Sequence, residues 1–387
     1  MLHVVTAIDA EGPIVDPAKP DILDSWERVD GLLGRLFSPA LREAAPDSLG
    51  HGPVLSWFVL SLWGVRHNPY QRPANSLEVF DRYAGRWGRA MAAWGDGLYW
   101  HYHQPSPCGA ANRWCADWTH ADCYDEVLAR LLVDRGFFPS CFRAGGRIED
   151  NDLSHWLEEI IPFDYSCCSG AVDWDRVESC GEPLRAFCDW SRAPSDWSWY
   201  HPDRDDYQRP GAMRRTVLRC PDLASPVHTL TDRDIEAAFA RAASGAPTVL
   251  ATFEHDRRDV TADRLADAFA RIASAGRRHP AVPWRYATAQ AGAAAVTVGQ
   301  ALPAPTLDIA PGPGGRARVT AAGALFNRPF VALGDASGNL RRRAGLACVG
   351  RGKWLTDPLP EGTAVVAAAA AGPTGEVGTA RFVVIKA

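Results

Sequence analysis

Apolar and polar positions along residues 1–300 predict strands that alternate with helices. Short apolar runs predict strands at residues 2–8, 54–62, 98–102, 140–142, 163–167, 216–218, 248–253 and 284–287. Segments with helical spacing of apolar residues lie between several of them, at residues 77–94, 124–133, 153–161, 232–243 and 261–275. This alternation is typical of a parallel sheet, either open or closed into a barrel.

Residues at the ends of these helical segments support the assignment. Thr231, followed three residues later by Asp234, predicts a capped helix start, and Asn151 is a plausible cap for the segment at 153–161. Gly136 and Gly276 are predicted to end the helices that precede them.

Residues 301–387 follow a different pattern and are predicted to form a small β-rich domain. They contain no His and no Tyr, and the prolines and glycines between residues 303 and 315 are typical of a linker and turns. Short β-type runs follow at residues 317–321, 329–333, 346–349, 363–367 and 380–385, which favours a small antiparallel sandwich. The alanine run at 367–371 is also compatible with a helix. We therefore divide the chain into an α/β domain of residues 1–300 and a β-sandwich-like domain of residues 301–387.

Composition excludes some classes of protein and disfavours others. The chain has 387 residues and a formal net charge of −5, which makes it a poor candidate for nucleic-acid binding. No apolar run reaches the ~18–20 residues of a membrane span, and the N-terminus lacks the features of a signal peptide. We therefore expect a cytoplasmic protein whose ten cysteines are reduced thiols. Its expected partner is a small molecule or a saccharide, and nothing in the sequence specifies an oligomeric state.

Polar side chains recur where the predicted strands end. They are Asp9, Glu11, His101, His103, Arg143, Asp164, Glu254, His255 and Asp256. In parallel α/β architectures the functional face lies at the carboxyl ends of the strands, so we expect these groups to converge there.

The histidine pair is the strongest candidate for a metal site. In an extended segment, His101 and His103 project to the same side, so both imidazoles can reach one ion. Zinc commonly takes two histidines and one carboxylate and keeps one position open, and Asp9 or Glu11 can supply that carboxylate. The alternatives are a structural histidine pair and, for the two acids, a loop cap or a surface ion pair. His255, between two acids, is either a general acid or part of a solvated turn.

Six short motifs resemble those of the polysaccharide deacetylases of the NodB-homology type. They are the stretches at 6–13 (TAIDAEGP), 56–58 (SWF), 94–103 (WGDGLYWHYH), 142–146 (FRAGG), 163–166 (FDYS) and 249–256 (VLATFEHD). The resemblance covers residues 1–290 in order. Ala10 stands where the family has a second aspartate, and the two histidines are two residues apart where the family has them four apart.

The resemblance implies a distorted (β/α) barrel and a metal-dependent hydrolase that removes an N-acyl group, most often acetyl, from an amino sugar. A divalent metal, with Zn²⁺ expected, would be bound by His101, His103 and one carboxylate, which we assign to Glu11. Asp9 would then act as the base, oriented by Arg143.

The resemblance also implies that His255 protonates the departing amine, with its ring held by Asp164 or Asp256. Two other functions stay open: an amide hydrolase acting on a ureide, formamide or natural-product amide, and a non-catalytic carbohydrate-binding protein. Trp100, Tyr102 and Trp199 are candidate walls for a sugar ring, although for each of them taken alone core packing is favoured.

Overall fold

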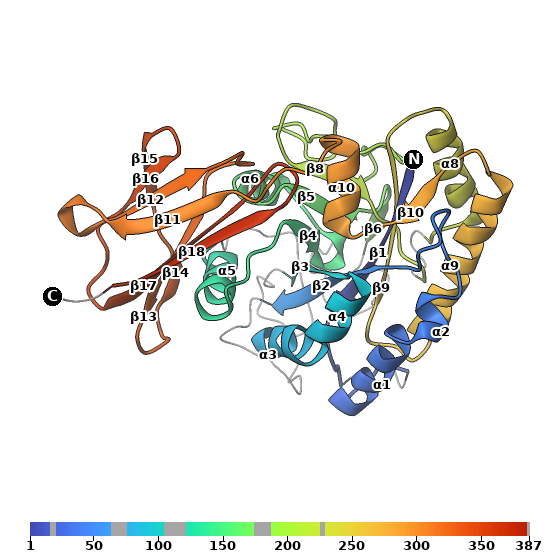
Figure 1. Ribbon diagram of the computed structural model, residues 1–387, viewed down its shortest axis with the longest axis horizontal. Coiled ribbons are helices and arrows are strands. Elements are labelled where there is room, and N and C mark those ends of the chain that lie inside the picture. Colours follow the sequence, from blue (N-terminus) through green and yellow to red (C-terminus); the bar gives the residue numbers. More distant parts are fainter. Residues whose placement is uncertain (16–20, 63–75, 104–120, 174–186, 225–228, 385–387) are drawn as a thin grey trace.

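The computed structural model of this chain describes residues 1–15, 21–62, 76–103, 121–173, 187–224 and 229–384. It contains a nearly closed barrel of parallel strands and two larger antiparallel sheets (Figure 1). Among the described residues, no helix combines the length and the apolar character needed to cross a bilayer.

Parallel strands form the barrel. They are β1 (Leu2–Ala10), β2 (Leu55–Leu62), β3 (Gly97–His103), β4 (Cys141–Ala144), β5 (Phe163–Cys167), β8 (Thr216–Arg219) and β9 (Thr248–His255), with β10 (Trp284–Tyr286) beside the start of β1. Their order is β10-β1-β2-β3-β4-β5-β8, and β9 pairs in parallel with β1. The segment after β8 nearly closes the barrel by hydrogen bonding with β9. Phe253 N donates to Pro221 O, and Leu223 N donates to Phe253 O, each at 3.0 Å.

Helices cover the barrel, and most of those predicted are present. They are α1 (Trp26–Leu36), α2 (Pro39–Arg42), α3 (Ser76–Asp81), α4 (Gly88–Trp94), α5 (Ala121–Arg135), α6 (Asn151–Glu158), α8 (Asp232–Ala243), α9 (Thr261–Arg278) and α10 (Ala289–Thr297). The expected helix at 77–94 is α3 and α4 joined by a π-helical segment, η1 (Arg82–Trp87). The sequence reading missed α1, α2 and α10.

The predicted helix ends are partly correct. The capping box of Thr231 and Asp234 at α8 is confirmed. The cap of α6 is Asp150 and not Asn151, because the Asp150 side chain accepts from Leu153 N at 2.9 Å. Helix α9 runs past Gly276 to Arg278.

Alternation along the strands separates two apolar layers. Side chains such as Val5, Tyr99 and Phe253 belong to a cluster inside the barrel, which α10 joins through Ala289 and Ala293. Side chains of the opposite parity belong to a second cluster between the barrel and its helices. Every second side chain of a strand points to the same face, so the strand positions that fill the interior cluster are followed, on the same face, by polar residues at the carboxyl ends.

Residues 306–383 form two four-stranded antiparallel sheets. One has the order β11 (Thr306–Pro311), β12 (Ala317–Ala322), β16 (Lys353–Thr356), β15 (Leu346–Gly350), and the other β14 (Arg341–Arg343), β13 (Phe330–Asp335), β17 (Thr363–Ala371), β18 (Val377–Val383). One expectation is corrected, because residues 306–311 are a strand and not a linker. The alanine run 367–371 is part of β17, so its helical alternative is excluded.

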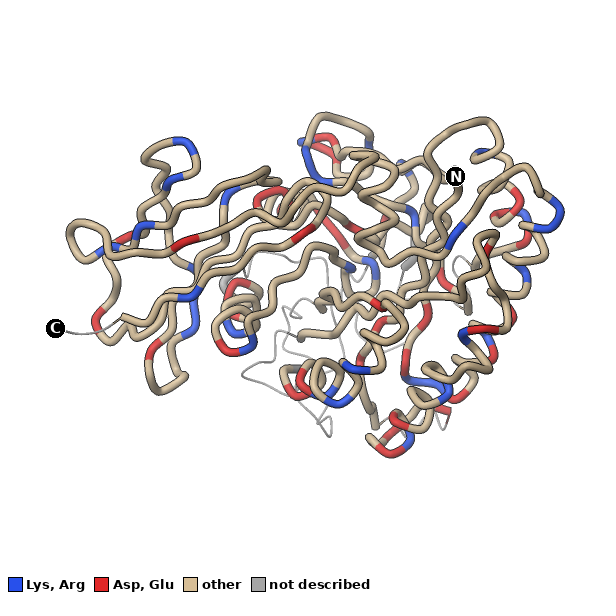
Figure 2. Tube along the Cα trace, viewed as in Figure 1, with Lys and Arg blue, Asp and Glu red and all other residues tan. Residues whose placement is uncertain are grey.

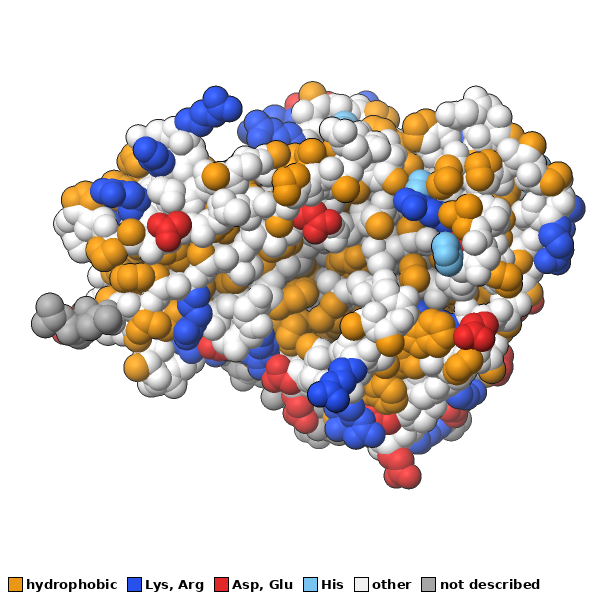
Figure 3. Space-filling model, viewed as in Figure 1, with side chains coloured by type: hydrophobic (Ala, Val, Ile, Leu, Met, Phe, Trp, Pro, Cys, Tyr) orange, Lys and Arg blue, Asp and Glu red, His pale blue; other side chains and the backbone are white. Residues whose placement is uncertain are grey.

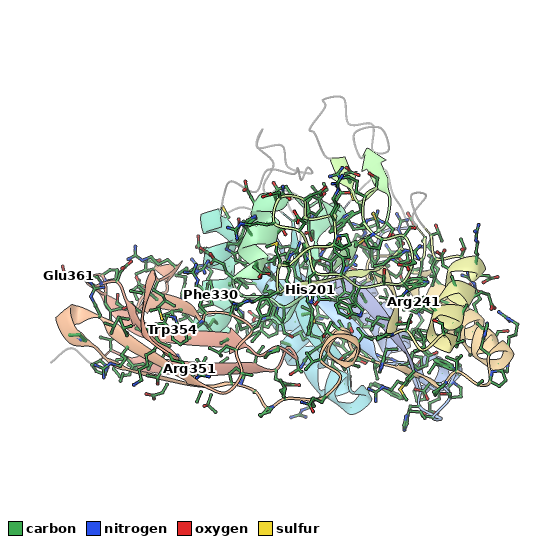
Figure 4. The ribbon with its side chains drawn as sticks, turned by 90° about the horizontal axis from the view of Figure 1, so that it is seen from above. His201, Arg241, Phe330, Arg351, Trp354 and Glu361 are labelled. Atoms are coloured by element: carbon green, nitrogen blue, oxygen red, sulfur yellow. The ribbon has the colours of Figure 1, made fainter. Side chains whose placement is uncertain are left out.

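Apolar side chains of both sheets share one core, to which Val319, Val331 and Val366 contribute. The second sheet also packs against α5. Just after this helix, the ring of Phe138 lies 5.5 Å from that of Phe330 between centroids. Phe330 lies where these sheets meet the rest of the molecule (Figure 4).

Charged side chains of both signs are spread over the surface (Figure 2). On the helices at the right of that view, basic and acidic residues alternate. Some residues of opposite charge form ion pairs, as where Arg271 Nε lies 2.7 Å from Asp232 Oδ1. At the left of Figure 3, over the C-terminal sheets, basic side chains stand apart from one another with an acidic one between them. Arg318, Arg351 and Lys353 are exposed.

Candidate metal centre

The carboxyl end of the barrel interior brings together Asp9, Glu11, His101, His103, Arg143 and His255. Glu254 lies opposite Ile8 and pairs with Arg264, and Asp164 also projects outward. Asp9 lies opposite His255 in the pairing of β1 with β9, and His101 lies opposite Arg143 in the pairing of β3 with β4. Asp9, Glu11, His101, His103 and Arg143 are all buried, whereas the side chain of His255 is 19% exposed. His255 therefore marks the side of the site that faces solvent.

Two imidazole nitrogens and one carboxylate oxygen form a compact set of possible ligands. The Nε2 atoms of His101 and His103 lie 3.0 Å apart, and Glu11 Oε1 is 4.0 Å from the first and 3.8 Å from the second. All three atoms fall within 4.8 Å of one another. Ligand atoms around a tetrahedral zinc ion with bonds of about 2.0–2.1 Å are separated by about 3.3 Å. The three residues therefore fit a divalent ion after small movements of Glu11.

The hydrogen bond of His101 leaves its other nitrogen available as a ligand. Its Nδ1 lies 2.9 Å from the carbonyl oxygen of Arg143. A carbonyl oxygen only accepts, so Nδ1 carries the proton and Nε2 of the neutral ring carries the lone pair. Burial lowers the pKa of His101, and the nearby Arg143 acts in the same direction. The ring is thus neutral near pH 7, which is the protonation state that binds metals.

Backbone contacts to Asp256 fix the position of Glu11. The amides of Glu11 and Gly12 donate to the two carboxylate oxygens of Asp256 at 2.9 and 3.1 Å, and the Tyr83 hydroxyl donates to the same group. Burial raises the pKa of Asp256 to about 6, although these donors oppose the change. Arg257 Nη1 donates to Glu11 Oε2 at 2.9 Å. Glu11 is therefore held with Oε1 toward the histidines.

Asp9 is held as a carboxylate anion by a two-pronged ion pair. Arg143 Nε and Nη2 donate to its two oxygens at 2.7 and 3.0 Å. The guanidinium also donates to Tyr165 O at 2.6 Å and lies 3.9 Å from the centroid of the Phe253 ring. Burial alone would raise the pKa of Asp9, but the charge of Arg143, with smaller effects of His101 and His255, lowers it to about 2.

His255 lies beside both acids. Its Nε2 is 3.6 Å from Glu11 Oε1 and 4.0 Å from Asp9 Oδ2. Its Nδ1 lies 3.8 Å from Glu254 Oε1, which is beyond direct hydrogen bonding but close enough for electrostatic attraction. The ring is thus positioned next to the three possible ligands, with part of its surface exposed to solvent.

Asp164 does not belong to this site. In the pairing of β4 with β5 it lies opposite Phe142, so it projects to the outer face of the barrel while Arg143 projects inward. Its carboxylate accepts from Arg215 and, at 2.6 Å, from the Ser166 hydroxyl. The expectation that Asp164 or Asp256 holds the ring of His255 is therefore corrected, because Asp256 instead contacts the backbone after β1.

Sequence reasoning missed several residues that shape the site. Tyr83 lies in the π-helical segment and Arg257 follows β9, and neither position carries a recognisable signal in one sequence. Gly145 was visible only as part of a motif, yet a Cβ there would lie 2.8 Å from Cα of His103. Trp100 and Tyr102 are buried in the layer between barrel and helices, so they pack in the core and are not sugar-ring walls. Trp199 is partly buried against the interior cluster.

Comparisons with known proteins add no further identification. No family model matches the chain, and no curated protein or solved structure matches it either. The resemblance to polysaccharide deacetylases therefore rests on the motifs in the sequence.

Proposed function

We propose that this protein is a metal-dependent hydrolase that removes an N-acyl group, in the first instance acetyl, from an amino sugar or a sugar-containing metabolite. The observation that supports the proposal most is the buried set of His101, His103 and Glu11, whose ligand atoms lie within 4.8 Å of one another. The Asp9–Arg143 pair and His255 beside this set supply the acid and base groups that amide hydrolysis needs.

In this proposal, His101, His103 and Glu11 hold a zinc ion. When bound, zinc supplies a Lewis acid that polarises a carbonyl and lowers the pKa of water to about 7. Asp9, kept anionic and immobile by Arg143, accepts the proton of the attacking water. His255, on the solvent side, donates a proton to the departing nitrogen. The two acids thus have different tasks, because Glu11 faces both imidazoles and Asp9 is bound by Arg143.

Acetate release from a panel of N-acetyl amino sugars, by protein stripped with a chelator and reloaded with zinc, tests the proposal. Simple formamides and ureides in the same panel distinguish a sugar deacetylase from an amidase of non-sugar substrates. We expect turnover only after metal loading and only with the acetylated sugars. Zinc-loaded protein that binds the sugars without releasing acetate would contradict the proposal and favour a carbohydrate-binding protein.

Substitution of His255 separates its role from that of a ligand. His255→Ala should keep the zinc content and lower kcat by about 10²–10⁴, the range for a lost acid–base group. His51→Ala, at an exposed position before β2, is the control and should leave both values unchanged. Loss of zinc from His255→Ala would instead show that this residue is a ligand.

A further inference from the structure

Two buried cysteines lie side by side at the end of β5. Cys168 follows β5, and Cys188 is the central residue of β7 (Phe187–Asp189), which pairs with β6 (Ala171–Asp173). Their Sγ atoms are 3.8 Å apart, and neither residue is exposed. The two thiols belong to an apolar cluster that is separate from the metal centre.

The two thiols differ in their surroundings. Cys188 Sγ donates to the carbonyl oxygen of Arg147 at 3.1 Å, and Cys168 Sγ lies 3.5 Å from Gly170 O. The hydrogen-bonding contact with Cys188 lowers the pKa of Cys168, although burial opposes this, and the charge of Arg147 acts in the same direction as Cys188. Burial raises the pKa of Cys188. Cys168 is therefore the nucleophile of the pair, since the thiolate is the reactive form.

We propose that Cys168 and Cys188 form a reversible dithiol–disulfide couple that exchanges with low-molecular-weight disulfides such as oxidised glutathione. The Cys168 thiolate attacks one glutathione sulfur, which breaks the glutathione disulfide and releases one glutathione thiolate. Cys188 then loses its proton and attacks the Cys168 sulfur, which releases the second glutathione. Two protein thiols are oxidised and one glutathione disulfide is reduced to two thiols, so atoms and electrons balance.

Closing the disulfide requires only a local movement, whereas the first exchange step requires this part of the chain to open enough to admit glutathione, because both cysteines are buried. The sulfurs must approach from 3.8 Å to the bond length of about 2.05 Å, a change within the reach of side-chain rotation combined with a small backbone shift. Cys167, the adjacent residue, is directed elsewhere, because its Sγ lies 3.7 Å from the Ser169 hydroxyl. Cys188 is therefore paired with Cys168 and not with the adjacent Cys167, because only the Cys168 sulfur is directed toward it.

Oxidation would change a turn that supports a proposed metal ligand. Once Cys188 is in a disulfide it has no hydrogen to donate to Arg147 O, which still accepts from Trp190 Nε1 at 2.8 Å. Arg147 has a positive φ of 60° and ends the short turn that begins at Gly145, whose backbone packs against His103. The disulfide thus acts on the backbone next to His103, and this consequence rests on the proposed metal site.

Peptide mass spectrometry tests the couple itself and needs no metal. Protein is equilibrated at a series of oxidised-to-reduced glutathione ratios, both in its folded form and by refolding in the same buffers, then acid-quenched and alkylated. We expect a peptide pair linked through Cys168 and Cys188 that disappears on addition of reductant. Cys168→Ser and Cys188→Ser should each abolish it, whereas Cys167→Ser and Cys348→Ser, at a buried neighbour and an exposed thiol, should keep it. No linked pair by either route, or equal linkage to other cysteines, would overturn the proposal.

Zinc affinity, measured after removal of glutathione, tests the effect on the turn separately. Oxidised protein should bind zinc about tenfold more weakly than reduced protein, the lower end of what loss of an outer contact costs. Cys168→Ser removes the attacking thiol and leaves Cys188 able to donate to Arg147 O, so its affinity should stay at the reduced value in both buffers. Equal affinity of the oxidised and reduced forms would contradict this effect, and the linked peptides would still report the couple.

Discussion

Replacing Arg143 with methionine tests whether the buried ion pair maintains the site. The substitution removes two hydrogen bonds to Asp9, one to Tyr165 O, and the contact with the Phe253 ring. Asp9 is only 2% exposed, so its charge would lose its partner without gaining water. Removing one member of such a pair typically costs 3–5 kcal/mol, and we expect a loss of about 4 kcal/mol in the free energy of unfolding at pH 7.

The pH dependence of this loss follows from the pKa of Asp9. The pair lowers that pKa from 3.8 to about 2, so its stabilisation is fully present above pH 4 and is lost as the pH falls through 2. The difference between wild type and Arg143→Met should therefore narrow below pH 4. Urea unfolding followed by tryptophan fluorescence at several pH values measures it.

Two further variants make the test specific. Arg241→Met breaks an exposed pair with Asp196, at 3.2 Å and with side chains 28% and 60% exposed, and should cost about 0–1 kcal/mol. Combining Arg143→Met with Asp9→Asn should recover part of the loss, because no uncompensated charge is left. A loss below about 1 kcal/mol for Arg143→Met, or a double variant equal to the sum of the single ones, would refute the reasoning.

Two other predictions concern the folded barrel. Burial, together with Arg285, lowers the pKa of His3 from 6.5 to about 4, so the unfolded chain binds the extra proton and the free energy of unfolding falls as the pH drops from about 6.5 to 4. His3→Gln should remove up to about 3 kcal/mol of this pH dependence in urea titrations. An unchanged dependence of stability on pH would contradict the prediction. Gly145→Ala should weaken zinc binding, measured by calorimetry, because the new Cβ would lie 2.8 Å from Cα of His103. Gly85→Ala is the control, since its new Cβ meets open space and should leave the zinc affinity unchanged. Equal zinc affinities of the two variants would contradict the packing argument.

The strands and their carboxyl-end residues could be predicted because each carries a local signal. An apolar run followed by a polar residue, as at Asp9 or His255, is visible without knowledge of the register. The inward or outward direction of a side chain is different, because it depends on which residue of the next strand lies opposite. Asp164 is the second residue of its strand, and the pairing of β4 with β5 places it opposite Phe142, on the outer face.

The groups that support the site could not be predicted for a related reason. Asp256 accepts from the amide of Glu11, which lies 245 residues away in sequence. The Tyr83 hydroxyl, in a π-helical segment, donates to the same Asp256 carboxylate. Such contacts depend on the closure of the barrel and leave no spacing to read. The missed strand at 306–311 has another cause, since its flanking prolines are typical of a linker, and the strand forms through pairing with β12.

The zinc content of the purified chain, with matched variants, is the most direct test of the account. Elemental analysis after zinc loading and removal of free metal should give one ion per chain for wild type and for His51→Ala, and none for His101→Ala or His103→Ala. Glu11→Gln should lose the ion and Asp9→Asn should keep it, because only Glu11 Oε1 faces both imidazoles. Wild-type protein that retains no divalent ion, or histidine variants that retain as much as wild type, would contradict the central claim that this barrel holds a metal centre.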